Sequence, residues 1–193
     1  MFCWFKSFLT NIALVKKFIL YSVFFTAISC ALFACNQASS FTLLSGTKIT
    51  LNSKLCVYIF LNSECPICQK YQGTFKSMEL DSVQVYYVFP GLQSKEMIKE
   101  MCEFDSISFN RVILDSDYRL TKQLKAHTTP EAIIIKDNKT YYSGLIDDRF
   151  TSIGTSKSSA SINYIENALN SLHKNEAIKI PYTKAVGCFI EPN

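Results

Sequence analysis

Two cysteines separated by two residues, Cys65 and Cys68, constrain this chain more than any other feature. They follow an apolar run at residues 55–61, which predicts a strand buried on both faces, and they precede a helical pattern at residues 69–80. A strand that leads into Cys-x-x-Cys at a helix start is typical of dithiol oxidoreductases, because two thiols at this spacing can close into a disulfide and reopen. The unpaired N–H groups of the first helical turn favour a thiolate, and Pro66 suits that turn because its missing N–H is not needed there.

The same spacing also occurs in zinc ribbons and in inert structural pairs. A zinc ribbon needs a second pair of ligands, and the chain has no second Cys-x-x-Cys and no His-x-x-x-His. The remaining candidate ligands are scattered singly along the sequence, at Cys102, Cys188, His127 and His173. We therefore favour redox chemistry over a metal site at the dithiol.

The N-terminal part of the chain has the pattern of a leader. Lys6, Lys16 and Lys17 precede an uncharged run at residues 18–35, as in a secretory signal. The run ends in Leu32-Phe33-Ala34-Cys35, which resembles the lipobox of bacterial lipoproteins and makes Cys35 the candidate lipidation site. An uncleaved signal anchor and ordinary cleavage with release are the alternatives. Lipidation and an uncleaved anchor would both hold the rest of the chain outside the cytoplasm, at a membrane.

Composition excludes some classes of protein. The chain has 193 residues and is 48% hydrophobic, which allows a sizeable core and excludes global disorder. Its net charge is +4, but without residues 1–34 there remain 17 basic and 16 acidic residues, a net charge of +1. This near-neutral balance offers no electrostatic basis for binding nucleic acid.

Strand and helix patterns alternate through the rest of the chain. Strands are predicted at residues 55–61, 83–89, 111–114 and 131–136, with a hairpin partner at 140–144 and a short strand or hairpin within 41–50. Helices are predicted at residues 69–80, 94–104, 117–125 and 161–174. This order predicts an α/β fold in which helices flank a mixed central sheet.

The order of elements resembles the thioredoxin fold, and more narrowly the redoxin-type thioredoxin-like proteins of bacterial envelopes. The matching stretches lie between about residues 41 and 190, and they are Leu61-Asn62-Ser63-Glu64-Cys65-Pro66-Ile67-Cys68, Val88-Phe89-Pro90-Gly91, Thr129-Pro130-Glu131, Tyr142-Ser143-Gly144-Leu145-Ile146-Asp147-Asp148-Arg149 and Gly187-Cys188. We therefore divide the chain into a leader, a tether with a short strand, a thioredoxin-like domain and a tail packed on that domain, at residues 1–34, 35–50, 51–175 and 176–193.

The dithiol and one proline loop carry the expected chemistry. Cys65 is the expected nucleophile, which attacks a substrate disulfide, and Cys68 is the thiol that resolves the mixed disulfide. The resemblance implies that Pro130 is a cis-proline facing the dithiol, and that the backbone of Thr129 pairs with the main chain of the substrate. Only about 5% of X-Pro bonds are cis, so spacing alone does not predict this isomer.

Three further residues are candidates for supporting roles. Glu131 is a candidate proton relay to Cys68, with a surface carboxylate at a strand edge as the alternative. Cys188 is a candidate accessory thiol or a partner for Cys102, and a plain tail cysteine is the alternative. His127 lies three residues before Pro130 and could complete a copper site with the dithiol, with a loop histidine as the alternative.

The leading hypothesis is a membrane-tethered thiol–disulfide oxidoreductase of the cell envelope, whose only redox group is the Cys65–Cys68 disulfide. Its expected partners are cysteine-containing envelope proteins, a redox partner and the membrane, with no nucleic acid. One alternative is a copper metallochaperone that uses Cys65, Cys68 and His127. A peroxiredoxin is disfavoured, because its Pro-x-x-x-Thr/Ser-x-x-Cys pattern would need Pro and Thr or Ser where Tyr58 and Asn62 stand. Pro-Ile between the cysteines leaves the direction of electron flow open.

Overall fold

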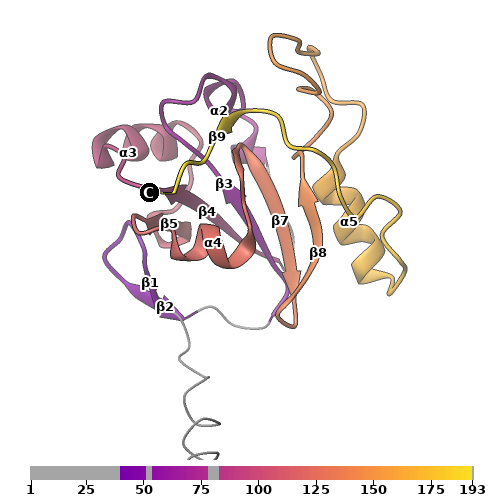
Figure 1. The fold of residues 1–193 in the computed structure, drawn as a ribbon, viewed down its shortest axis with the longest axis horizontal. Helices are drawn as coiled ribbons and strands as arrows, with labels where there is room; N and C mark the ends of the chain where they lie inside the picture. Colours follow the sequence, from indigo (N-terminus) through magenta and orange to yellow (C-terminus); the bar gives the residue numbers. More distant parts are fainter. Residues whose placement is uncertain (1–39, 51–53, 78–82, 193) are drawn as a thin grey trace, which may run out of the picture. The chain divides into compact units, whose positions relative to one another are not determined.

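A computed structural model of the chain describes residues 40–50, 54–77 and 83–192 (Figure 1). The predicted leader, the candidate lipidation site Cys35 and residues 36–39 of the tether therefore lie outside the described residues. Within the described ranges, none of the helices has the length and apolar character that crossing a bilayer requires.

A five-stranded mixed sheet in the order β5-β4-β3-β7-β8 forms the centre of the fold (Figure 1). Its strands are β3 (Cys56–Phe60), β4 (Gln84–Pro90), β5 (Val112–Asp115), β7 (Glu131–Lys136) and β8 (Lys139–Gly144). The first three run parallel to one another, whereas β7 is antiparallel to β3 and β8 is antiparallel to β7. The prediction of an α/β fold with a mixed central sheet is confirmed, and the arrangement is that of the thioredoxin fold.

Side chains alternate along β3 and divide the core between the two faces of the sheet. Odd-numbered residues from 57 to 61 join a cluster with α2 (Pro66–Lys70), α3 (Lys95–Phe104) and α5 (Tyr164–His173). Even-numbered residues from 56 to 60 join a second cluster with α4 (Arg119–Leu124) and with β1 (Ser40–Thr42), which forms a hairpin with β2 (Lys48–Thr50). All of β3 is buried, because both faces of the sheet are covered.

The helix that follows the dithiol is shorter than the predicted residues 69–80. α2 ends at Lys70, and a turn and the single-turn helix η1 (Phe75–Ser77) follow it. Gly73 has a φ of +84°, a left-handed conformation that glycine adopts without strain and that does not continue a helix. Its N–H donates to Asp105 Oδ1 over 2.5 Å, which attaches the turn to the end of α3. The glycine that interrupts the helical pattern therefore lies in the turn that ends the helix.

Two acidic side chains cap the start of α4. Asp115, at the end of β5, accepts hydrogen bonds from the N–H groups of Leu120 and Thr121 over 3.0 and 2.8 Å, and its side chain is fully buried. Asp117, the first residue of the helix predicted at 117–125, accepts from Arg119 N–H over 3.4 Å and forms an exposed ion pair with the Arg119 side chain. Asp115 from the preceding strand and the local Asp117 thus both accept N–H groups of the first helical turn. The single-turn helix η2 (Phe109–Arg111) precedes β5.

The C-terminal tail, residues 176–192, runs back along the domain after α5 (Figure 1). It first lies beside β8, where Thr183 N–H donates to Ser143 O over 3.0 Å. Gly144 allows this approach, since it has a φ of +137° and a Cβ there would overlap the carbonyl of Thr183. The tail then forms β9 (Cys188–Phe189), which pairs antiparallel with the two-residue strand β6 (Thr128–Thr129).

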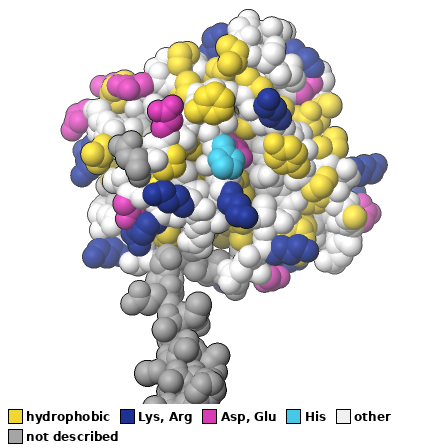
Figure 2. All heavy atoms as spheres, viewed as in Figure 1, with side chains coloured by type: hydrophobic (Ala, Val, Ile, Leu, Met, Phe, Trp, Pro, Cys, Tyr) yellow, Lys and Arg dark blue, Asp and Glu magenta, His cyan; other side chains and the backbone are white. Residues whose placement is uncertain are grey.

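The tail buries little side-chain surface. Every residue from 176 to 192 is at least partly exposed, and Tyr182 and Phe189 are 65% and 81% exposed. On the face shown in Figure 2, hydrophobic side chains reach the surface among charged groups of both signs. The tail is therefore held mainly by main-chain hydrogen bonds and by the Thr183 side chain, whose Oγ1 accepts from Leu145 N–H over 2.8 Å.

Candidate active site

The dithiol lies where the chain passes from β3 into α2. Cys65 precedes the helix in an extended conformation, with φ −75° and ψ 119°, and Pro66 takes the first helical position as the pattern predicts. Both thiols are buried, with 2% of Cys65 and 0% of Cys68 exposed. The N–H of Asn62 donates to Cys68 Sγ over 3.5 Å. Because the turn buries both thiols, the few polar groups that reach them govern their ionisation.

The two thiols of the motif have opposite pKa shifts. A hydrogen bond from the Cys68 thiol lowers the pKa of Cys65 to about 4, against the opposing effect of burial, and a further hydrogen bond from the Cys188 thiol acts in the same direction. Burial and the neighbouring Cys65 raise the pKa of Cys68 well above that of an ordinary thiol. The site therefore holds Cys65 as the thiolate and Cys68 as the thiol that donates to it. Neighbouring thiols provide much of the stabilisation of the Cys65 thiolate. The helix that follows it, α2, is only five residues long.

The loop that contains Pro130 faces the dithiol. The peptide bond between Thr129 and Pro130 is cis, the isomer that the resemblance implies. In its thiol form Cys65 donates to the carbonyl oxygen of Thr129, with an Sγ–O distance of 3.2 Å. Thr129 is 2% exposed and belongs to β6, the strand that β9 pairs with. The structure thus brings the Cys65–Cys68 pair together with Thr129 and Pro130, although Cys65 and Thr129 are 64 residues apart in sequence.

Cys188 is the third thiol at this site. Its main chain pairs with Thr129 in the β6–β9 ladder, and Thr129 Oγ1 donates to Cys188 O over 3.5 Å. A Cβ at Gly187 would overlap the carbonyl oxygen of Thr129, so a residue with a side chain could not bring the tail this close. Burial and the neighbouring Cys65 raise the pKa of Cys188 to about 11. The structure places Cys188 beside Cys65, whereas the sequence left a pairing with Cys102 open.

Cys56 and Cys102 behave as the small buried hydrophobes that their positions in an apolar strand and a helix predict. They are 2% and 0% exposed, and burial raises the pKa of both thiols, that of Cys102 to about 12. Neither thiol is poised for nucleophilic chemistry, because ionisation is suppressed.

Glu131 is a buried carboxylate, which corrects the alternative of a surface group at a strand edge. It is 6% exposed, and its Oε2 accepts hydrogen bonds from the N–H groups of His127 and Thr128 over 2.8 and 3.1 Å. Burial raises its pKa, although these two hydrogen bonds oppose the shift. Both bonds hold the loop that leads to Pro130, so the contacts favour a role in positioning the loop over proton relay to Cys68.

We expect Glu131→Ala to lower the free energy of unfolding by about 1–3 kcal/mol, because two buried N–H groups lose their acceptor. Glu131→Gln is the matched control, since its amide oxygen can accept both hydrogen bonds. A carboxyl whose pKa is raised in the folded state loses stabilisation as the pH rises from its ordinary value of 4.5 through the raised pKa. Denaturant titrations at several pH values should therefore show that the free energy of unfolding falls with rising pH in the wild type. The fall should be smaller in Glu131→Gln. An equal decrease in the free energy of unfolding in Glu131→Ala and Glu131→Gln would show that Glu131 does not hold the loop through these hydrogen bonds.

His127 does not join a metal site in the structure. Its side chain is exposed, and its backbone carbonyl accepts from Ile190 N–H over 3.0 Å. Among the residues that the structure describes, no group of three or more His, Cys, Asp or Glu side chains is arranged to hold a metal ion. The alternative copper set of Cys65, Cys68 and His127 is therefore not brought together, and His127 is the loop histidine that was the other interpretation.

Gln93 supports the dithiol loop, and the sequence offered no sign of this role. Its Oε1 accepts from the N–H and the hydroxyl of Ser63 over 2.9 and 3.1 Å. Its Nε2 donates to Pro90 O over 2.9 Å. Gln93 thus links the loop before Cys65 to the end of β4.

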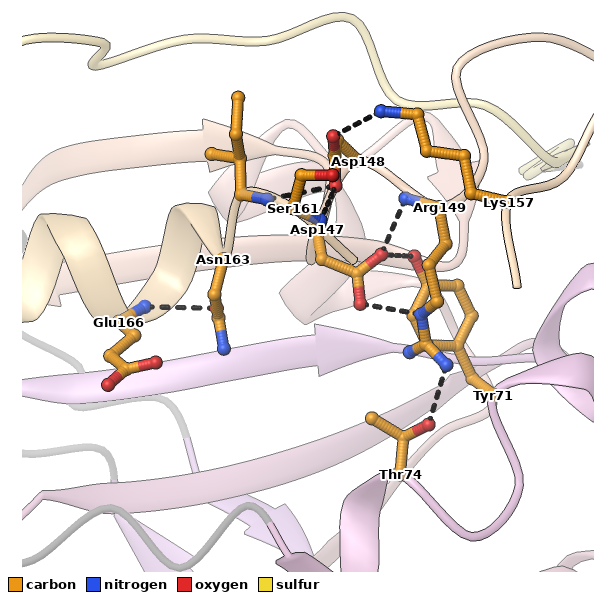
Figure 3. Close-up of polar contacts among 10 residues, drawn as sticks. Tyr71, Thr74, Asp147, Asp148, Arg149, Lys157, Ser161, Asn163 and Glu166 are labelled. Atoms are coloured by element: carbon orange, nitrogen blue, oxygen red, sulfur yellow. Dashed lines mark hydrogen bonds and ion pairs between the residues drawn. The ribbon is translucent and has the colours of Figure 1, made fainter. Parts of the chain in front are cut away.

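A buried ion pair anchors the far end of α2 (Figure 3). Arg149 Nε donates to Asp147 Oδ2 over 2.8 Å, and Tyr71 OH donates to Asp147 Oδ1 over 2.9 Å. The guanidinium also lies over the Tyr71 ring, 4.4 Å from its centre, and donates to Thr74 Oγ1 over 3.0 Å. Next to this pair, Asp148 accepts from Lys157 Nζ over 2.5 Å. Asp147 and Arg149 thus form an internal ion pair, and Asp148 forms a second pair with Lys157.

No family model matches the chain, and no curated protein matches it. Several solved structures do match the chain. A hypothetical protein from Sinorhizobium meliloti 1021 is 16% identical with a TM-score of 0.66, over 82% of this chain and 93% of that one. An uncharacterized conserved protein from Geobacillus kaustophilus is 21% identical with a TM-score of 0.62, over 82% of this chain and 92% of that one.

A secreted Mycobacterium tuberculosis disulfide oxidoreductase homologous to E. coli DsbE is similar over a smaller part. It is 15% identical with a TM-score of 0.47, over 53% of this chain and 80% of that one. The similarity to the two bacterial proteins of unassigned function extends over most of the chain and, at this identity, shows that the chain shares their fold.

Proposed function

We propose that this chain is a thiol–disulfide oxidoreductase that exchanges disulfides with cysteine-containing proteins of the cell envelope. One observation carries the proposal. A thiol whose pKa is lowered to about 4, Cys65, lies 3.2 Å from the backbone of Thr129, in the loop that ends at cis-Pro130. Disulfide exchange with a peptide requires a low-pKa thiolate beside a main-chain segment that can pair with an extended peptide.

The two thiols have different roles in the exchange. The Cys65 thiolate attacks one sulfur of a substrate disulfide, which forms a mixed disulfide and expels the other substrate sulfur as a thiolate. Cys68, held as a thiol by burial, then loses its proton and attacks Cys65 Sγ, which releases the second substrate thiol. In the reverse direction the Cys65–Cys68 disulfide oxidises a substrate dithiol. The disulfide itself is the only redox group that this proposal needs.

The ionisation of Cys65 favours the oxidising direction. A stabilised thiolate stabilises the reduced form of the couple, so the disulfide becomes the less stable partner and accepts electrons more readily. Dithiol proteins with a nucleophile pKa of about 7 have potentials of about −270 mV, and those with a pKa of about 3.5 have potentials of about −120 mV. A pKa of about 4 for Cys65 supports a couple near the oxidising end of this range.

The cellular setting is part of the proposal and is supported by the sequence. The basic residues and apolar run of the leader, followed by Cys35, support export and attachment to a membrane through a lipid or an uncleaved anchor. The disulfide chemistry also fits an oxidising compartment outside the cytoplasm.

The reduction potential of the Cys65–Cys68 couple tests the proposal. The purified protein is equilibrated in glutathione buffers, its thiols are alkylated, and the reduced fraction is read by mass spectrometry. We expect a reversible couple closer to about −120 mV than to about −270 mV. The double variant Cys65→Ser/Cys68→Ser is the control and should show no such couple. The absence of a reversible couple in the wild type would overturn the proposed function.

A further inference from the structure

The strand that carries Cys188 lies where a substrate strand would lie. The proposed function needs the main chain of Thr129 to pair with an extended peptide beside Cys65. In the structure this edge is already paired, because β9 runs antiparallel to β6 and sets Cys188 opposite Thr129. Ile190 N–H extends the pairing with a hydrogen bond to His127 O over 3.0 Å. Figure 1 shows β9 beside α2, the helix that Cys65 precedes.

The register places a cysteine where the substrate cysteine must be. Cys188 donates a hydrogen bond to the Cys65 thiolate, and each of the two sulfurs contributes to the pKa shift of the other. Cys65, Cys68 and Cys188 are all unpaired thiols in this structure. Cys65 therefore has two neighbouring thiols with which it can exchange.

The fit of the tail depends on specific residues at two points. Gly187 lies so close to Thr129 that any Cβ would overlap its carbonyl oxygen. Thr183 holds the tail further upstream through its contacts with Tyr142 OH and Leu145 N–H, each at 2.8 Å. Between these points the side chains stay partly exposed, so a competing peptide would need to displace main-chain hydrogen bonds but little buried surface.

We propose that Cys188 is a third redox thiol and that the tail acts as a tethered substrate, which forms an intramolecular Cys65–Cys188 disulfide. This inference rests on the proposed function and adds to it a reaction within the chain. It also implies that a protein substrate reaches Thr129 only when β9 has moved away, because one strand edge pairs with one peptide at a time.

The exchange balances without an added oxidant. The Cys188 thiolate attacks Cys65 Sγ of the Cys65–Cys68 disulfide, the bond between these two sulfurs breaks, and Cys68 leaves as a thiolate. Cys68 takes up one proton, which matches the proton that Cys188 has lost, and the number of disulfides is unchanged. In the reduced protein the negative charge of Cys65 helps to keep Cys188 protonated. That charge disappears when Cys65 enters a disulfide, so Cys188 becomes easier to ionise when an exchange partner is present.

The same thiol can resolve a mixed disulfide with an outside partner. When Cys65 carries a partner sulfur, the Cys188 thiolate attacks Cys65 Sγ, forms Cys65–Cys188 and releases the partner as a thiolate. This step needs only the partner's own disulfide as the oxidant. It can therefore be isolated in a protein that lacks Cys68.

The test uses the variant Cys68→Ser treated with oxidised glutathione and analysed by intact mass and by peptide mapping. We expect most of the product to carry a Cys65–Cys188 disulfide and no glutathione. In Cys68→Ser/Cys188→Ser we expect a stable glutathione adduct on Cys65 instead. The matched control Cys68→Ser/Cys102→Ala should still form Cys65–Cys188, because Cys102 lies in the core and takes no part.

A second variant tests the strand itself. Gly187→Val in the Cys68→Ser background keeps Cys188 but moves β9 away from Thr129, so we expect the glutathione adduct to replace the internal disulfide. A glutathione adduct that persists in Cys68→Ser alone would overturn the tethered-substrate inference and leave the proposed function intact. Failure of Cys65 to react with glutathione in every variant would instead count against the proposed function.

Discussion

The Cys65 thiol of the reduced protein is expected to ionise with a midpoint near its lowered pKa of about 4, rather than at the ordinary value of 9.0. The cause is the pair of hydrogen bonds that the thiols of Cys68 and Cys188 donate to its sulfur. The effect is large, because at about pH 6 a thiol with a pKa of 9.0 is ionised in about one molecule in a thousand, whereas Cys65 should be almost fully ionised. A titration of the ultraviolet absorbance of the thiolate measures this midpoint directly.

Two variants show which groups are responsible. Cys65→Ser should lose the low-pH transition entirely. Cys188→Ser should move the midpoint upward, because one of the two donors to the thiolate is weakened or displaced. The rate of alkylation of Cys65 should also stay nearly constant above the midpoint, since only the thiolate reacts. A single transition near the ordinary thiol value in the wild type would show that the thiolate is not stabilised.

Asp147→Ala is expected to lower the free energy of unfolding by about 3–5 kcal/mol, the loss that follows when one partner of a buried ion pair is removed. The side chains of Arg149 and Asp147 are only 16% and 6% exposed, so the guanidinium would be left buried without its carboxylate. Tyr71 OH would lose its acceptor at the same time. Urea titration of the wild type and the variant measures the difference.

The control is a similar ion pair at the surface. Asp117 and Arg119 also pair two residues apart, but their side chains are 59% and 54% exposed. Asp117→Ala should therefore cost less than about 1 kcal/mol, because solvent screens the pair. If the two variants were equally destabilised, burial of the Asp147–Arg149 pair (Figure 3) would not explain the stability lost in Asp147→Ala.

Local patterns in the sequence were enough to predict the fold class. The continuous apolar run of β3 predicted a strand covered on both faces, and all five of its residues are buried. Ser94 is the first residue of the helix predicted at 94–104, and its hydroxyl caps α3 by accepting from Met97 N–H over 3.3 Å. Both features depend on residues that are close together in the sequence. Hydrophobic periodicity and capping patterns therefore predict them.

Where a distant residue competes with a local pattern, prediction from the sequence failed. The helix after the dithiol was predicted to continue to residue 80, but Gly73 turns the chain and Asp105 accepts its N–H. Glu131 could not be recognised as buried, because a single carboxylate at the start of an apolar strand fits either environment. Its burial follows from the loop that folds back to donate two N–H groups to it.

Residue spacing and hydrophobic order were sufficient to predict a mixed α/β fold and a dithiol between a buried strand and a helix. The residues that surround that dithiol depend on long-range contacts. Thr129 and Cys188 reach Cys65 through strand pairing between segments 59 residues apart, and the close approach of Gly187 to Thr129 permits it. Contacts of this kind leave no periodic trace in the sequence, since they depend on how the completed sheet presents its edges.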